Sequence, residues 1–360
     1  MKRVKSLAMV LLLSCVLLTA WTREAASDYV YQDLGLLPGL SSAEAWNISG
    51  HLVVGRCFTT GSQDYEGFIW TPASGIHPLG TAGGTYSRAY GVNRLGDSVG
   101  FSQTADALEL AFFKTKRGAM KALPYLPSPN PYARGYAINS LRQIVGFSNN
   151  EFSNYKACIW WDPDSTDPPQ NLGNLTGEPE HNSIAFCIND YTQVVGDSIG
   201  TNGLDRPMYW DPANGMRDLG TLGGGSGLAR GINNGGAVVG SADNLDGLRE
   251  GFIIRPNAAS PRMRGLGGLG GSGEFSGFAT LSYAQGINGR GEVVGFAYNA
   301  DNEQVAFLWT REGGIQNLNT LVQDLPEGVV LSRACAINAH GDIVGFTAAG
   351  QAFFLYPEPL

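Results

Sequence analysis

Two serine segments carry residue types and spacing that could support nucleophilic catalysis. GDSVG (96–100) fits G-x-S-x-G, in which a serine at a sharp turn attacks a carbonyl group. That role needs a strand, the turn and then a helix, and no helical pattern follows Ser98. In GDSIG (196–200), Ser198 is expected at the start of a loop. We therefore assign no catalytic residue from these motifs.

Metal and cofactor chemistry have equally little support in the sequence. GLGGLG (265–270) fits the dinucleotide-binding pattern but lacks the required βαβ context. We predict no cofactor and no metal site, because none of the four histidines is spaced as a metal-binding pair: His51, His77, His181 and His340.

Four cysteines lie in apolar, strand-like segments, and two states remain open for them. An exported protein permits disulfides, whereas their apolar surroundings favour buried free thiols. The four are Cys57, Cys158, Cys187 and Cys335.

Arginine offers the remaining chemistry, because a guanidinium group can clamp a carboxylate through two hydrogen bonds. Arg88, Arg134 and Arg333 each stand five residues before a repeated asparagine, and Arg230 lies close to another. These four are the candidate ligand-binding residues, for an acidic polysaccharide or peptide. The alternative is that they form ion pairs with acidic loops of neighbouring repeats.

The elements that position these residues come from one unit repeated seven times. Its signature phrase, GINNGGAVVG at 231–240, recurs with small edits along the chain. The spacings between its asparagines are 46, 46, 50, 44, 55 and 50 residues, which indicates a propeller or solenoid. The repeated asparagines are Asn47, Asn93, Asn139, Asn189, Asn233, Asn288 and Asn338.

Each unit contains four short strand-like segments bounded by Gly, Asn and Pro. The first runs into the asparagine, the second resembles AVVG, the third is aromatic, as in AFLW (306–309), and the fourth resembles MRDLG (216–220). The third segment repeats a tryptophan that we expect to pack between blades: Trp70, Trp160, Trp210 and Trp309.

Four strands in seven copies predict an all-β fold, a seven-bladed β-propeller of four-stranded blades. The last unit ends at AFFLYPEPL without a fourth strand, and YVYQDLG (29–35) precedes the first asparagine. This N-terminal strand should therefore close the last blade and remove a free sheet edge. We assign residues 27–360 to this single domain.

The repeated asparagine is expected to shape a turn. In IN-x-x-G, Asn leads a type I turn and Gly closes it, so the first two strands form a hairpin. Arg142 and Thr192 replace the glycine in two copies. If the asparagine only shapes the turn, Asn233→Asp should be tolerated, because aspartate can make the same hydrogen bond to the backbone.

The two faces of the ring should differ. Tight turns after the first and third strands share one face, and the long, variable connections share the other. Binding residues concentrate on variable loops carried by a rigid scaffold, so we expect a ligand on the variable face.

The N-terminus predicts export. A basic start and an apolar run from Leu7 to Leu18 form a signal peptide over residues 1–20, cleaved after Ala20 or as far as residue 26. We expect a secreted or periplasmic protein without a membrane span. Lipid anchoring through Cys15 is disfavoured because an apolar segment follows it. The net charge of −8 disfavours nucleic-acid binding.

The units LGTLGGGSGLARGINNGGAVVGSA (219–242) and AQGINGRGEVVGFA (284–297) resemble the HAF-type extracellular repeat family of bacterial exported proteins. The resemblance covers nearly the whole mature chain and implies a β-rich exported protein. The His-Ala-Phe that names the family is absent here, since its histidine position carries Glu66, Leu110, Lys156, Arg206, Glu250, Val305 or Gln351. A role for that histidine is therefore unsupported.

These observations favour a binding or interaction scaffold over an enzyme. Seven similar units bring together no convergent catalytic set, so we predict a monomer whose partner is an extracellular glycan or protein. The alternative is an enzyme acting on extracellular polysaccharide, a lyase or hydrolase. That enzyme would need a carboxylate, Tyr or His with a perturbed pKa in a pocket on the variable face.

Overall fold

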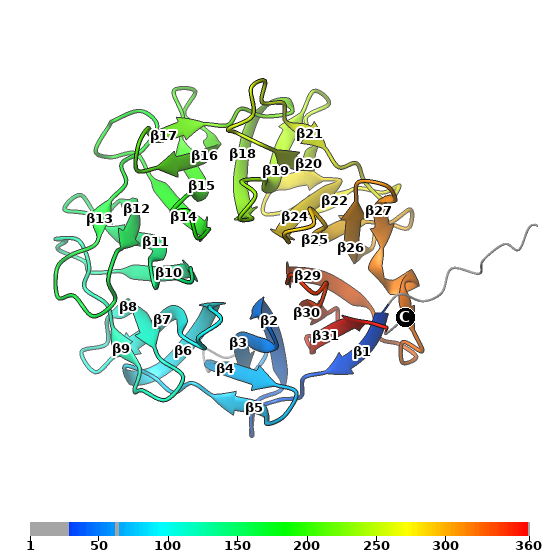
Figure 1. Ribbon diagram of the computed structural model, residues 1–360, viewed down its shortest axis with the longest axis horizontal. Coiled ribbons are helices and arrows are strands. Elements are labelled where there is room, and N and C mark those ends of the chain that lie inside the picture. The colour runs from blue at the N-terminus through cyan, green and yellow to red at the C-terminus, as the bar shows by residue number, and fades with distance from the viewer. Residues whose placement is uncertain (1–28, 62–64, 359–360) are drawn as a thin grey trace, which may run out of the picture.

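The computed structural model describes residues 29–61 and 65–358, which form seven sheets in a ring around a central axis (Figure 1). Each sheet is a blade whose first strand lies nearest the axis. The chain is therefore a seven-bladed β-propeller, as the repeats predicted. The predicted signal segment 1–20 and Cys15 lie outside the described residues.

Blades 1 to 4 are four-stranded meanders. Blade 1 contains β2 (Ser42–Ser49), β3 (Leu52–Phe58), β4 (Tyr65–Thr71) and β5 (Gly75–Pro78). Blade 2 contains β6 (Gly83–Val92), β7 (Ser98–Thr104), β8 (Glu109–Lys114) and β9 (Lys121–Ala122). Blade 3 contains β10 (Ala133–Ile138), β11 (Ile144–Asn149), β12 (Tyr155–Trp160) and β13 (Gln170–Asn171). Blade 4 contains β14 (Ser183–Ile188), β15 (Val194–Ile199), β16 (Asp205–Asp211) and β17 (Gly215–Asp218).

Blades 5 to 7 depart slightly from this plan. Blade 5 contains β18 (Gly223–Ile232), β19 (Val238–Asn244), β20 (Arg249–Ile254) and β21 (Arg264–Gly265), with a small hairpin, β22 (Gly273–Phe275) and β23 (Phe278–Thr280). Blade 6 contains β24 (Ser282–Ile287), β25 (Val293–Tyr298), β26 (Gln304–Thr310) and β27 (Gly314–Asn317), followed by a 3₁₀ turn, η1 (Leu318–Thr320), and β28 (Val322–Gln323). Blade 7 contains β29 (Leu331–Ile337), β30 (Ile343–Thr347), β31 (Ala352–Pro357) and β1 (Tyr29–Asp33).

The N-terminal strand closes the ring, which confirms the predicted seam. β1 pairs antiparallel with β31, from Tyr29 opposite Pro357 to Asp33 opposite Phe353. In Figure 1 the first and last strands of the chain lie side by side. β28 adds a short parallel pairing on the other edge of β1, so that edge is partly covered as well.

The hydrophobic core lies between neighbouring blades rather than at the centre of the molecule. One cluster joins Val145 and Ile159 of blade 3 to Ile188 and Met208 of blade 4. The repeated tryptophans of the third strands are buried, as expected for packing residues: Trp70, Trp160, Trp210 and Trp309.

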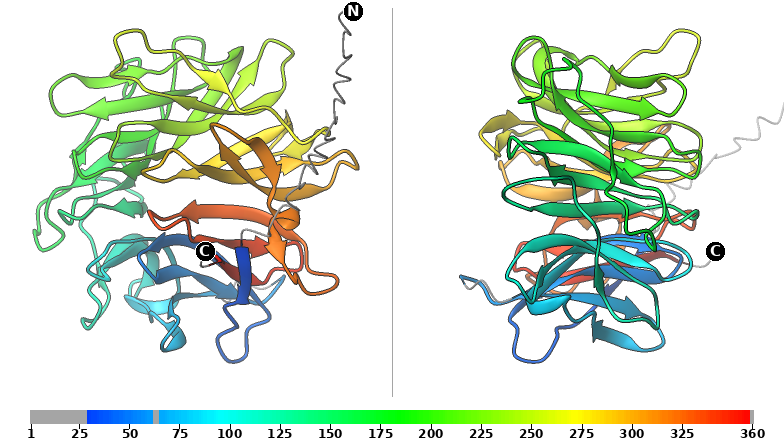
Figure 2. Two further views of the ribbon diagram at one scale, coloured as in Figure 1. Left: turned by 45° about the vertical axis from the view of Figure 1, so that its right-hand side comes forward. Right: turned by 90° about the vertical axis from the view of Figure 1, so that its left-hand side faces the viewer.

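The up-and-down order of the strands gives the ring two different faces. The turns after the first and third strands of each blade reach one face, here called the hairpin face. The connections after the second and fourth strands reach the opposite one, the linker face. The turned views in Figure 2 show loops projecting from both.

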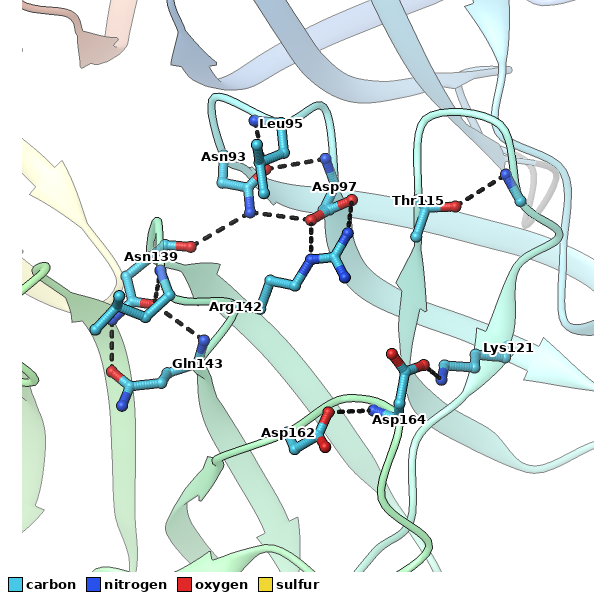
Figure 3. A network of polar contacts seen from close by, with 12 residues as sticks. Asn93, Leu95, Asp97, Thr115, Lys121, Asn139, Arg142, Gln143, Asp162 and Asp164 are labelled. Atoms are coloured by element: carbon cyan, nitrogen blue, oxygen red, sulfur yellow. Dashed lines mark hydrogen bonds and ion pairs between the residues drawn. The ribbon is translucent and has the colours of Figure 1, made fainter.

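Six of the seven repeated asparagines form hairpin turns and also tie each blade to the next. The Oδ1 atom of Asn93 accepts hydrogen bonds from the backbone N–H groups of Leu95 and Asp97, both at 3.0 Å. Its Nδ2 atom donates to the main-chain carbonyl of Asn139 in the next blade at 3.3 Å (Figure 3). The same inter-blade bond starts from Asn139, Asn189, Asn233, Asn288 and Asn338.

Asn47 is the exception, and its assignment as a turn residue is wrong. It lies within β2, paired with Val54, and the turn of blade 1 lies between Ser49 and Leu52. The blade 1 hairpin is one residue shorter than the others, so Ser49 takes the position that asparagine holds elsewhere. Asn338 accordingly donates to the carbonyl of Gly50, at 2.8 Å.

The two copies without the turn glycine keep its backbone conformation. Arg142 and Thr192 have φ angles of 65° and 60°, a left-handed region that favours glycine. Each compensates with a side-chain bond to the preceding blade. Arg142 Nε donates to Asp97 at 2.8 Å (Figure 3), and Thr192 Oγ1 donates to Gln143 at 2.9 Å.

Candidate functional site

Every inner strand is interrupted by a β-bulge at the same level of the channel. In blade 2 the pairing register shifts between Ala89 and Gly91, so Tyr90 is the extra residue. A bulge re-aims the side chain of its extra residue. The extra residues of blades 1 to 7, here called the bulge ring, are Trp46, Tyr90, Tyr136, Phe186, Arg230, Gln285 and Cys335.

The glycine that ends each AVVG-type segment permits this bulge. It lies in the second strand, and a Cβ atom there would fall 1.8–2.1 Å from a carbonyl oxygen of the inner strand. In blade 5, for example, a Cβ on Gly240 would lie 2.1 Å from the carbonyl oxygen of Leu228. No larger residue tolerates such an approach without a backbone shift. The repeated phrase therefore encodes both the turn and the bulge.

The bulge ring lines a central cavity of 190 Å³. The remaining lining residues follow the bulge along the inner strands, such as Ile232 and Ile287, so the cavity extends from the ring towards the hairpin face. Asn47, displaced from the turn, also lines it. Of the four candidate arginines, only Arg230 is a lining residue.

Arg88 and Arg134 lie on the linker-face side of the bulge ring and pair with the preceding blade. Arg88 Nη2 lies 3.3 Å from Glu44 Oε2, which Arg56 Nε also contacts at 2.8 Å. Arg134 Nη2 lies 2.7 Å from Glu109 Oε1. These contacts fit the alternative interpretation of ion pairs between neighbouring repeats, although the acidic partners lie on strands.

Arg333 differs from both. Its guanidinium carbon lies 4.7, 4.4 and 5.4 Å from the ring centres of Phe275, Phe296 and Phe346. It has no ion pair among the described residues, and its Nε atom is buried without a hydrogen-bond partner. Burial lowers the pKa of Arg333 from its ordinary value. The aromatic contacts hold a cation that forms no ion pair with a described carboxylate, although Glu44 attracts it from a greater distance.

Arg230 lies in the cavity wall beside a buried acid. Its Nε atom donates to the hydroxyl of Tyr283 at 3.2 Å, and its guanidinium carbon lies 3.9 Å from the ring centre of Phe186. Asp197 is near enough to interact electrostatically with Arg230, but its Oδ1 atom is buried without a hydrogen bond. Burial raises the pKa of Asp197 to about 7.

The remaining candidate groups show no catalytic arrangement. The four cysteines are free thiols, and burial raises the pKa of each, so they stay protonated at neutral pH. Ser98 is buried in β7, and Ser198 Oγ, within β15, accepts a bond from the backbone of Leu175. Within residues 29–61 and 65–358, no three His, Cys, Asp or Glu side chains converge as metal ligands, and no helix has the length and apolarity to cross a membrane.

Sequence reasoning missed the bulge ring, although a signal for it exists. In each copy the bulge residue stands between two small residues or beside one, as in Ala229-Arg230-Gly231 and Ala284-Gln285-Gly286. The small neighbours pack between strands, while the central residue varies from Trp to Cys. Within a strand whose other positions repeat in every copy, one position that varies in size and polarity indicates a side chain that does not pack in the core between the blades.

Comparison with known proteins supports the fold and no narrower assignment. No protein-family model matches the sequence, and no curated protein is similar to it at a significant level. Solved structures match the fold. The BP39L lectin from Burkholderia pseudomallei is 11% identical over 92% of this chain and 96% of its own, with a TM-score of 0.51.

Two hydrolase structures match similarly. The propeller domain of the Trilobed protease from Pyrococcus furiosus is 12% identical over 88% of this chain and 95% of its own, with a TM-score of 0.52. That domain is described as having an open velcro topology, whereas β1 closes the ring here. A puromycin-hydrolyzing peptidase from Mycobacterium tuberculosis is 11% identical over 86% of this chain and 48% of its own, with a TM-score of 0.52. At these identities the matches establish a β-propeller fold only.

Proposed function

We propose that this chain is an exported repeat scaffold that binds an anionic ligand, an acidic glycan or an acidic peptide, at the linker-face mouth of its channel. Arg88, Arg134 and Arg333 occupy equivalent positions on three inner strands there. The observation that carries the proposal is Arg333, a cation held over three aromatic rings without an ion-pair contact among the described residues.

The local charge balance supports an anion. Arg56, Arg88, Arg134 and Arg333 surround this mouth, and their described carboxylate partners are Glu44 and Glu109. The protein as a whole carries a net charge of −8. Concentrating arginines at one mouth of an acidic protein gives that mouth a field that attracts anions.

Export is part of the proposal. The basic and apolar N-terminus and the resemblance to HAF-type extracellular repeats favour a protein outside the cytoplasm, where glycans and peptides are available ligands. The variable linkers reach the same face as the arginines, as expected for a binding surface on a rigid scaffold.

The test is isothermal titration calorimetry at low salt with polygalacturonate, poly-glutamate and a neutral galactan. Arg333→Gln removes the unpaired charge, and Arg311→Gln is the matched control, because Arg311 is exposed in the turn between β26 and β27 on the opposite face. A charge-assisted hydrogen bond contributes about 1.5–3 kcal/mol, so Arg333→Gln should weaken binding of the acidic polymer roughly 10- to 100-fold. Equal binding of galactan, or an unchanged affinity in Arg333→Gln, would contradict the proposal.

A second candidate, a lyase or hydrolase acting on extracellular polysaccharide, is favoured by one observation. Among the described residues, Asp197 is the carboxyl group whose pKa is raised to about 7, near the value suited to a general acid or base. If the protein turns over a polysaccharide and Asp197→Asn abolishes that turnover, the protein is an enzyme and the proposal of a binding scaffold is wrong.

A further inference from the structure

The bulge ring divides into an aromatic half and a half without aromatic side chains. In blades 1 to 4 it carries Trp46, Tyr90, Tyr136 and Phe186, whose successive ring centres lie 6.0, 4.9 and 5.2 Å apart. In blades 5 to 7 it carries Arg230, Gln285 and Cys335. The cavity therefore has one continuous aromatic wall, and the opposite wall carries the polar side chains of Arg230 and Gln285.

Arg230 lines this cavity and keeps two terminal nitrogens available to a ligand. Its Nε atom donates to the Tyr283 hydroxyl, and its guanidinium carbon lies over the Phe186 ring, 3.9 Å from the ring centre. Neither of its two terminal nitrogens has a hydrogen-bond partner among the described residues, and neither is fully buried. Two parallel N–H groups fixed in this way match the two oxygens of a carboxylate.

Two further polar groups of the cavity wall are also unengaged. The side-chain amides of Gln285 and Asn47 line the cavity, and neither forms a side-chain hydrogen bond within the described part of the chain. Both are partly accessible rather than sealed. They can therefore bond to hydroxyl or carboxylate oxygens of a ligand bound by Arg230.

The cavity volume matches a single ring. An apolar protein cavity of about 150 Å³ holds one benzene molecule. At 190 Å³, the central cavity accommodates one six-membered ring with a carboxylate. The aromatic wall suits the flat face of such a ring.

We propose that the central cavity binds a monocyclic carboxylate, with Arg230 holding the carboxylate and the aromatic half of the bulge ring packing against the ring. The carboxylate is either a free aromatic acid or a sugar acid, free or at the end of a chain. This inference deepens the proposed function, since it specifies which part of an acidic ligand enters the channel. It also stands apart from Arg333, which does not line the cavity.

The test is titration of the full chain with benzoate and galacturonate, each against a neutral analogue, benzyl alcohol and galactose. Binding by either acid supports the proposal, and the acid that binds identifies the ring. Arg230→Gln should weaken that binding at least tenfold, and Arg311→Gln should leave it within twofold. Binding of neither acid, or equal binding of the neutral analogue, would overturn the proposal.

A second variant covers the case in which Arg230→Gln unfolds. Gln285→Phe breaks no described side-chain bond and fills the cavity, so it should abolish binding of the acid while the melting temperature stays near that of the parent. If Gln285→Phe binds the acid normally, the cavity is not the site. An unchanged polygalacturonate affinity in Arg333→Gln would contradict the linker-face site alone, whereas absence of small-acid binding by the parent protein would contradict the central cavity alone.

Discussion

Replacing Asn233 with Asp tests whether the repeated asparagine shapes only its own turn. The Oδ1 atom of Asn233 accepts a hydrogen bond from the Ala237 N–H at 3.0 Å, and aspartate would keep this bond. Its Nδ2 atom donates to the carbonyl of Asn288 in the next blade at 2.8 Å. Aspartate would put a carboxylate oxygen against that carbonyl. Because the inter-blade hydrogen bond would be lost, we expect Asn233→Asp to destabilise the protein substantially, whereas the turn alone predicted that it would be tolerated.

The magnitude follows from the environment of the bond. Asn233 is 7% exposed, so the lost donor is not replaced by bulk water. An unsatisfied buried polar group costs about 1–3 kcal/mol, so we expect Asn233→Asp to lose about 2 kcal/mol at pH 7. Unfolding entropy of about 2.1 cal/mol/K per residue over roughly 330 residues gives about 0.7 kcal/mol/K. The melting temperature should therefore fall by about 3 °C.

The assay is thermal unfolding at pH 7 and at acid pH. Protonation of the new aspartate restores a donor, so the variant should recover stability relative to the parent as the pH falls. Asn202→Asp is the matched control, because Asn202 also donates to a carbonyl, that of Gly225 at 2.9 Å, but is exposed to water. If Asn233→Asp melts within about 0.5 °C of the parent at pH 7, or resembles Asn202→Asp at every pH, the asparagine does not join the blades.

Three further predictions follow from the closure, the bulge and the buried acid. Deleting residues 27–36 removes β1 and exposes the edge of β31, so unfolding should become less cooperative and aggregation should increase; a truncated chain that melts like the parent would refute this closure. Gly240→Ala should destabilise the protein several times more than Gly289→Ala. The added Cβ would lie 2.1 Å from a carbonyl oxygen at position 240, whereas at position 289 it would meet nothing within 4 Å. Equal chemical denaturation curves for the two variants would show that the bulge does not require this glycine. Asp197 has a folded pKa of about 7 against an ordinary value of 3.8, so the folded state retains a proton that the unfolded state loses, and stability should fall as pH rises from 4 to 7. Asp197→Asn should remove up to about 4 kcal/mol of this pH-dependent loss of stability. This value is an upper limit, because the side chain is not completely shielded from solvent. Identical profiles of stability against pH for the variant and the parent would show that Asp197 ionises normally.

The ring could be predicted from the sequence because the features that define it are local and repeated. A hairpin needs turn residues at fixed offsets, and a blade interface needs an aromatic third strand, as at Trp210 and Trp309. The missing strand of the last unit and the extra strand before the first followed from counting. Because every blade packs in the same way, the same residue types are favoured at the turn and interface positions of each unit.

The positions that were misread are those where one residue changes the register. In blade 1 the shorter hairpin moves Asn47 from the turn into β2, although its neighbours still resemble the repeated phrase. The spacing of the repeats does not determine the pairing register of the strands. A shift of the register by one residue is a small change in spacing, but it reverses the face that each side chain occupies. The inter-blade bond of the asparagines was also missed, since its acceptor is a backbone atom of another unit.

The bulge explains how seven equivalent blades can produce an asymmetric site. Its backbone geometry is fixed by elements present in every copy: the small residue before the bulge and the glycine of the second strand opposite it. The bulge side chain itself takes no part in that packing, so its identity is free. Trp46 and Arg230 occupy equivalent positions, yet one contributes an aromatic surface and the other a cation. Substituting one residue per blade can therefore change the chemistry of the channel without altering the fold, which is why specificity should be sought in the bulge ring rather than in the asparagine turns.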